Sequence, residues 1–123
     1  MLLLDEVVSA SEGAVTTRII LSEDSPFMSA LGVPAAIGLE YLAQSAAAYF
    51  GLKARDGEAP RAGMLVACRQ YSCERAFFSG TLNVEVSATS ALPNTDAAGL
   101  VKFSGLIREA EQVIAQGELS VYL

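Results

Sequence analysis

The sequence contains no histidine, and this absence excludes several kinds of site. A serine nucleophile such as Ser25 or Ser45 has no imidazole to act as its base. Cys68 and Cys73 are the only cysteines, so a zinc site would lack two or more of its usual ligands. In a regular strand, residues five positions apart point to opposite faces, so we expect these two thiols not to pair locally and to be buried or reduced.

Basic residues are also scarce: 8 Lys and Arg side chains stand against 14 Asp and Glu, which gives a formal net charge of -6. Nucleic-acid binding requires a clustered basic face, so we expect no nucleic-acid partner. No apolar run reaches the length of a membrane span. The apolar start at residues 1–4 is too short for a signal peptide and is followed by acidic residues. We therefore expect a cytoplasmic protein with no membrane partner.

Glycine-rich loops that bind phosphate and dinucleotide fingerprints are also absent, and we expect neither a metal nor another cofactor. What the chain does contain is apolar material, since 52% of its 123 residues are hydrophobic. This length and composition fit one folded domain covering residues 1–123.

One long helix is predicted over residues 33–51. Pro34 suits the first helical position, and Gly51 is a possible end, although residues 52–55 could extend the helix. Apolar side chains occupy nearly all of its faces, which is typical of a buried helix. One row of small residues also carries Glu40 and Gln44. Such a row leaves room for a slender ligand or for close packing against another helix, and both interpretations stay open.

Six other segments are predicted to be β-strands, and in four of them apolar and polar residues alternate. The order is two strands, the helix and four strands in meander order, which indicates an α+β domain. Because one helix cannot cover both faces of a six-stranded sheet, we expect a curved sheet wrapped around the helix, with an edge left for oligomerisation. The predicted strands are 2–9, 14–21, 64–71, 81–88, 100–108 and 113–123.

Glu40 is the strongest candidate for chemistry. Gln44 stands four residues later, so the two side chains meet on one helical face. A carboxyl group among small residues should be partly desolvated, which raises its pKa toward values useful for proton transfer. A structural role for Glu40 is an equal alternative. The amides of Ala35 and Ala36, at the start of the helix, could polarise a carbonyl oxygen, although every helix has such an end.

These motifs, in this order, resemble the hot dog fold and, within it, the 3-hydroxyacyl-acyl-carrier-protein dehydratases. Pro34, Glu40, Ala43 and Gln44 match the helix pattern of that family. Gly80-Thr81-Leu82 falls where the family has Gly-Asp-x-Leu. More narrowly, the chain is similar to the dehydratase-like subunits of aryl polyene gene clusters, and the following segments carry that likeness: 25–27, 32–35 and 38–44.

The resemblance implies a dimer in which an acyl chain enters a tunnel at the subunit interface. The acyl group would be carried as a thioester on the phosphopantetheine of an acyl carrier protein or of coenzyme A. Glu40 takes the position of the catalytic carboxylate, and the amide of Ala35 takes that of the donor to the thioester carbonyl. Ala36, Gln44 and Phe27 complete the expected substrate-binding residues.

The family's catalytic His, expected between Phe27 and the helix, is absent. Dehydration needs a base at the α-carbon and an acid at the β-hydroxyl. Glu40 would have to play both roles in turn, or a partner subunit would supply the second group. Aryl polyene relatives carry a Pro-His pair just before the first strand, and a start codon placed too far downstream would have removed it here.

Three hypotheses follow. The first is a dehydratase that uses Glu40 as general acid and base, and the resemblance favours it. The second is a non-catalytic subunit that binds an acyl chain or completes a heteromer with an active paralogue. Apart from such a heteromer, we expect a homodimer or a higher oligomer. The third is a hot dog thioesterase that uses Glu40. These three hypotheses leave open whether the chain is an enzyme.

Overall fold

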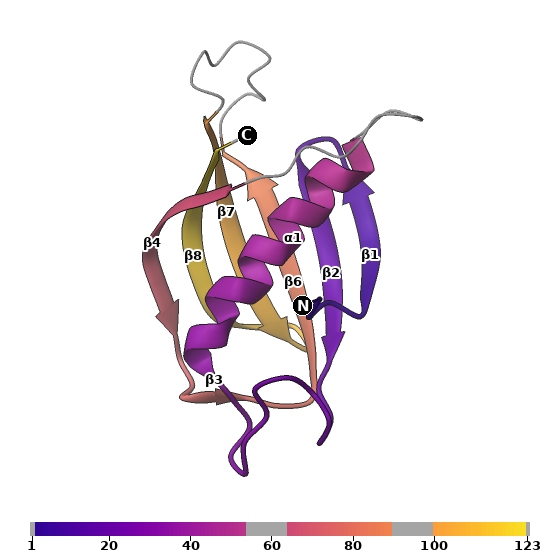
Figure 1. The fold of residues 1–123 in the computed structure, drawn as a ribbon, viewed down its shortest axis with the longest axis vertical. Coiled ribbons are helices and arrows are strands. Elements are labelled where there is room, and N and C mark those ends of the chain that lie inside the picture. The colour runs from indigo at the N-terminus through magenta and orange to yellow at the C-terminus, as the bar shows by residue number, and fades with distance from the viewer. Residues whose placement is uncertain (1, 54–63, 90–99, 123) are drawn as a thin grey trace.

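The structure is a computed structural model that describes residues 2–53, 64–89 and 100–122. The α-helix of the described residues runs diagonally across the inner face of a curved sheet (Figure 1). The elements in chain order are β1 (Glu6–Ser11), β2 (Ala14–Ile20), β3 (Val33–Pro34), the 3-10 helix η1 (Ala35–Ile37), α1 (Gly38–Lys53), β4 (Met64–Cys73), β5 (Phe77–Phe78), β6 (Thr81–Ala88), β7 (Leu100–Glu109) and β8 (Gln112–Tyr122).

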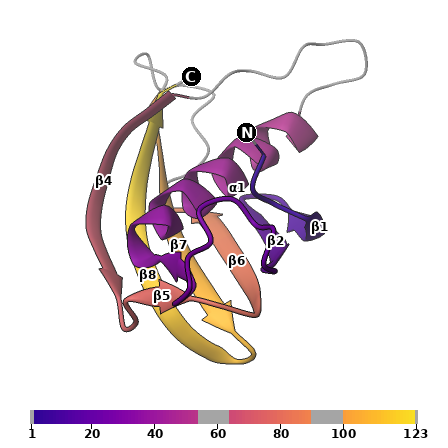
Figure 2. The same cartoon turned by 60° about the horizontal axis from the view of Figure 1, so that its bottom comes forward.

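The main sheet has six strands in the order β1-β2-β6-β7-β8-β4, and every neighbouring pair is antiparallel. Figure 2 shows β4 and β8 on one side of α1, and β1 and β2 on the other. The sheet therefore wraps around the helix, which confirms the predicted α+β architecture of the hot dog fold.

Alternating side chains build the core between sheet and helix. Leu82, Val84 and Val86 of β6 are buried, whereas the residues between them are more exposed, as the period of two predicts. Burial of each such side chain contributes about 1.5–3 kcal/mol. A Cβ atom added at Gly105 would lie 2.6 Å from a methyl group of Leu42, so the glycine allows α1 to pack directly on β7.

The start of the helix differs from the prediction. Pro34 has an extended backbone (φ -55°, ψ 141°) and pairs with Phe77 in a two-stranded sheet of β3 and β5, so it precedes the helix and does not open it. The chain then turns through η1 and enters α1 at Gly38. At the other end α1 continues past Gly51 to Lys53, into the predicted extension over residues 52–55. Residues 54 and 55 lie outside the described part.

Several strand predictions also need correction. The first strand begins at Glu6, not at residue 2, and the very short β3 and β5 were not predicted. The meander order holds for β6, β7 and β8. β4 pairs with β8 at the far edge of the sheet and does not neighbour β6, so the meander prediction was wrong for β4.

An irregularity in β4 overturns the expected placement of the two cysteines. Cys68 lies opposite Leu119, and Cys73 lies opposite Ala115. An interval of five residues on β4 therefore pairs with an interval of four residues on β8. The extra residue falls where Gln70 has a left-handed backbone (φ 55°). Both cysteines therefore face the core, not opposite sides of the sheet. Both are free thiols, and burial raises the pKa of Cys68.

A search of the described helix for a segment with the length and apolar character of a membrane span found none.

Candidate functional site

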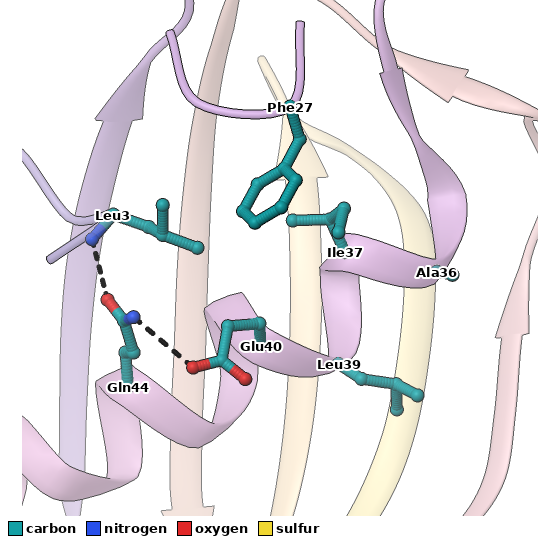
Figure 3. A pocket seen from close by; sticks show the side chains of 7 residues that line it. All are labelled: Leu3, Phe27, Ala36, Ile37, Leu39, Glu40 and Gln44. Carbon is teal, nitrogen blue, oxygen red and sulfur yellow. Dashed lines mark hydrogen bonds between the residues drawn. The ribbon is translucent and has the colours of Figure 1, made fainter. Parts of the chain in front are cut away.

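A cavity of about 340 Å³ opens beside η1 and the first turns of α1. Figure 3 shows that its walls come from separate parts of the chain: the segment before β1, the loop before β3, η1 and α1. The walls are largely apolar, and Glu40 supplies the one ionisable side chain among the lining residues. These residues are Leu3, Phe27, Ala36, Ile37, Leu39, Glu40 and Gln44.

The cavity brings together four of the five residues that the sequence placed in the site, namely Phe27, Ala36, Glu40 and Gln44. Among the other small residues of the predicted row, Ala43 and Ala47 do not line it. Three lining residues were not predicted, namely Leu3, Ile37 and Leu39. Leu3 belongs to the apolar start at residues 1–4 and to the strand predicted over residues 2–9, and neither pattern indicates that this segment lies against the helix.

Phe27 lines the cavity and has a backbone conformation that residues other than glycine rarely adopt. Its φ is 65°, and it lies within a turn that is closed by a hydrogen bond from the Met28 amide to the Ser25 carbonyl (3.1 Å). The ring stays 55% exposed and lies across the cavity from Glu40 (Figure 3). A strained residue of this kind at a cavity is typical of a functional site.

Glu40 is less enclosed than the sequence predicted. Its side chain is exposed in the single chain, and its neighbours in the cavity include the large side chains of Leu3, Phe27 and Ile37 in addition to small ones. The expected desolvation by small neighbours is therefore wrong for this chain on its own. The carboxylate stands at the surface because the cavity opens there.

Gln44 connects Glu40 to the N-terminal segment. Its Nε2 group donates to Oε1 of Glu40 (3.3 Å), and its own Oε1 accepts from the Leu3 amide (2.7 Å). The expected meeting of Glu40 and Gln44 on one helical face is confirmed (Figure 3).

The amide of Ala35 is not free. It donates to the carbonyl of Ala76 (2.9 Å), and this geometry conflicts with the prediction that it donates to a thioester carbonyl. The carbonyl of Ala35 is also bound, since the hydroxyl of Tyr71 donates to it (2.6 Å). Burial is the main reason that the pKa of Tyr71 is raised, so this hydroxyl keeps its proton. Of the two amides predicted as donors, that of Ala36 remains a candidate.

Among the described residues, no three His, Cys, Asp or Glu side chains lie close enough together to hold a metal ion.

Comparison with known proteins adds to this geometry. A family model described as ApeP-like, ApeP dehydratase, matches residues 1–123. Among solved structures, the dehydratase heterocomplex ApeI:P from Xenorhabdus doucetiae superimposes with a TM-score of 0.86 at 26% identity, covering 98% of this chain and 82% of that one. A search of curated proteins gave no match.

Two more distant structures share the fold. One is a putative thioesterase, a phenylacetic acid degradation-related protein from Ralstonia eutropha JMP134, with a TM-score of 0.71, 12% identity and coverage of 95% of this chain and 83% of that one. The other is a thioesterase from Haemophilus influenzae, with a TM-score of 0.69, 11% identity and coverage of 94% and 75%. At these identities the likeness concerns the fold alone.

Proposed function

The chain belongs to the ApeP-like dehydratase family, and from this membership we propose that it is one subunit of a hot dog heteromer that removes water from a 3-hydroxyacyl thioester. The thioester would be carried on a phosphopantetheine arm. We assign the reaction to aryl polyene biosynthesis.

The observation that carries this proposal is the position of Glu40 in a cavity with apolar walls. An acyl chain needs apolar side chains around it, and Leu3, Ile37 and Leu39 provide them. The reacting carbons need a group that transfers a proton, and Glu40 is the ionisable side chain among the lining residues. The amide of Ala36 is the candidate donor to the thioester carbonyl.

The proposed reaction balances with one acid and one base. Protonated Glu40 gives its proton to the β-hydroxyl, the bond between C3 and that oxygen breaks, and water leaves. A base removes a proton from C2, and the electron pair of that C–H bond forms the C2–C3 double bond. Glu40 ends as a carboxylate, and the base ends protonated, so proton transfer between them through solvent restores the starting state.

The second group is assigned to a partner subunit for two reasons. This chain has no His, and Glu40 stands exposed in the single chain, where water would compete for its proton. A second chain over the cavity mouth would exclude that water and could supply the base. The related structure from Xenorhabdus doucetiae, described as a heterocomplex, supports such an assembly.

A non-catalytic role is the second candidate, and the absence of His favours it. In that case the chain would bind the acyl group or complete the heteromer while the partner carries out the whole reaction.

Substitution Glu40→Gln separates the two candidates. We expect the heteromer with this change to lose water elimination from 3-hydroxyoctanoyl pantetheine by about 100-fold or more in kcat, since the acid is removed. The assay follows the ultraviolet absorbance of the conjugated product. Glu118→Gln, a change of an exposed residue on β8, is the matched control and should leave kcat unchanged. Full activity in Glu40→Gln would refute the catalytic proposal and leave the non-catalytic role.

A further inference from the structure

We propose that Gln44 is a positioning residue for Glu40: it holds the Oε1 atom of the carboxylate and leaves Oε2 as the oxygen that exchanges the proton. The inference rests on the proposed function and deepens it, because Gln44 would orient the carboxylate of Glu40 and would not bind the substrate.

The orientation of the Gln44 amide is fixed from one side by the main chain. The Leu3 amide lies 2.7 Å from Oε1 of Gln44, and because an N–H group can only donate, the oxygen of the Gln44 side chain must face it. Leu3 is 8% exposed, and the same segment is tied to β2 by a hydrogen bond from the Asp5 amide to the Arg18 carbonyl (2.9 Å). Turning the Gln44 side chain over would place its NH₂ group against the Leu3 N–H.

Once the oxygen faces Leu3, the NH₂ group of Gln44 must face Glu40. Its Nε2 atom lies 3.3 Å from Oε1 of Glu40. A proton on that oxygen would compete with the N–H donor, so the proton of the neutral acid belongs on Oε2. Figure 3 shows this second oxygen pointing away from Gln44. The main chain at Leu3 thus determines, through Gln44, which oxygen of Glu40 is available.

Two substitutions at Gln44 separate positioning from packing. Gln44→Glu keeps the length of the side chain and an oxygen for the Leu3 amide, but removes the donor to Glu40. Gln44→Met removes the acceptor and the donor together. The chain also offers a matched control: Gln112, at the start of β8, donates to Glu74 at 3.2 Å on the exposed surface, outside the cavity lining. Gln112→Glu therefore makes the same chemical change away from the site.

The test uses the heteromer and 3-hydroxyoctanoyl pantetheine. We expect Gln44→Glu and Gln44→Met each to lower kcat about tenfold or more with KM changed less than about twofold, because a misplaced acid affects the transition state more than binding. Gln112→Glu should match the unchanged protein. Hydrogen exchange at the Leu3 amide should stay slow in Gln44→Glu and become fast in Gln44→Met, which distinguishes loss of the donor from release of the segment.

Unchanged kcat in Gln44→Glu would overturn the inference, as would a raised KM at constant kcat, which would make Gln44 a substrate-binding residue. If Glu40→Gln abolishes turnover while Gln44→Glu does not affect it, only the positioning role fails. If Glu40→Gln retains turnover, the proposed catalytic function fails as well.

Discussion

Tyr41 shows how burial of a single residue governs the response to alkaline pH. The side chain is 1% exposed, and burial, with a smaller contribution from the charge of Asp5, raises its pKa from 10.0 to about 12. In the unfolded chain the phenol ionises near its ordinary value. The folded state therefore retains a proton that the unfolded state releases, and this contribution to stability is full below pH 10 and lost as the pH rises toward 12.

We expect the free energy of unfolding to fall by about 1 kcal/mol between pH 10 and pH 11 from Tyr41 alone. Urea unfolding at the two pH values measures this loss, and Tyr41→Phe is the control because its ring has no ionisable hydroxyl. The variant should lose correspondingly less stability over the same interval. An identical loss in both proteins would show that Tyr41 does not titrate in this way.

At the level of residues, spacing along the helix identified Glu40 and Gln44, because both lie on one face of a regular element. The engagement of the Ala35 amide was not predictable. Its partner, the Ala76 carbonyl, belongs to the segment between β4 and β5, far along the chain from Ala35, so this contact depends on the tertiary fold. The role of Leu3 in the cavity has the same explanation, since its contact with Gln44 joins residues 41 positions apart.

At the level of elements, the start of the helix depends on a close approach between Gly38 and Tyr71. A Cβ atom at Gly38 would lie 2.0 Å from the hydroxyl oxygen of Tyr71, and that hydroxyl is the donor to the Ala35 carbonyl. The absence of a side chain at Gly38 therefore permits the hydrogen bond that joins the beginning of the helical segment to β4.

Substitution Gly38→Ala should displace the Tyr71 hydroxyl and cost about 1–3 kcal/mol of stability, the range expected for overpacking. Tyr71→Phe alone should cost about 0.5–1.5 kcal/mol through the lost hydrogen bond. Because the clash at Gly38 is mainly with the hydroxyl, Gly38→Ala should cost less in the Tyr71→Phe background. Urea denaturation of the four proteins gives this coupling, and strictly additive losses would contradict the argument.

Regular elements were predictable in proportion to their length and regularity. The predicted bounds of β6 agree with the structure, and those of β7 and the start of β8 agree within one residue, because an apolar position recurs at every second residue. Residue 123, the predicted end of the last strand, lies outside the described part. β3 and β5 have two residues each, too few for any period to be visible. The extra residue in β4 breaks the period itself, and for that reason the orientation of Cys73 relative to Cys68 was predicted wrongly.

At the level of the whole molecule, the site is open to solvent in the single chain. The loop between β2 and β3 extends past the end of the sheet where the helical segment begins (Figure 1), and it carries Phe27 and Leu31 with 55% and 72% of their surfaces exposed. No single-chain pattern indicates which face a partner covers, because an exposed apolar residue and an interface residue look alike in sequence.

The heteromer proposed above predicts that Leu31 becomes buried on assembly. Removing a Leu side chain from an interface forfeits about 1.5–3 kcal/mol, so Leu31→Ser should weaken association with the second hot dog chain about tenfold or more. Ile20→Ser is the matched control, since Ile20 is 53% exposed and stands beside the inward-facing Ile19 on β2, hence on the outer face of the sheet. Sedimentation velocity of the two variants with the partner chain measures both dissociation constants. Equal affinities for Leu31→Ser and the unchanged protein would place the partner on another face and would contradict the proposal that it binds beside this loop.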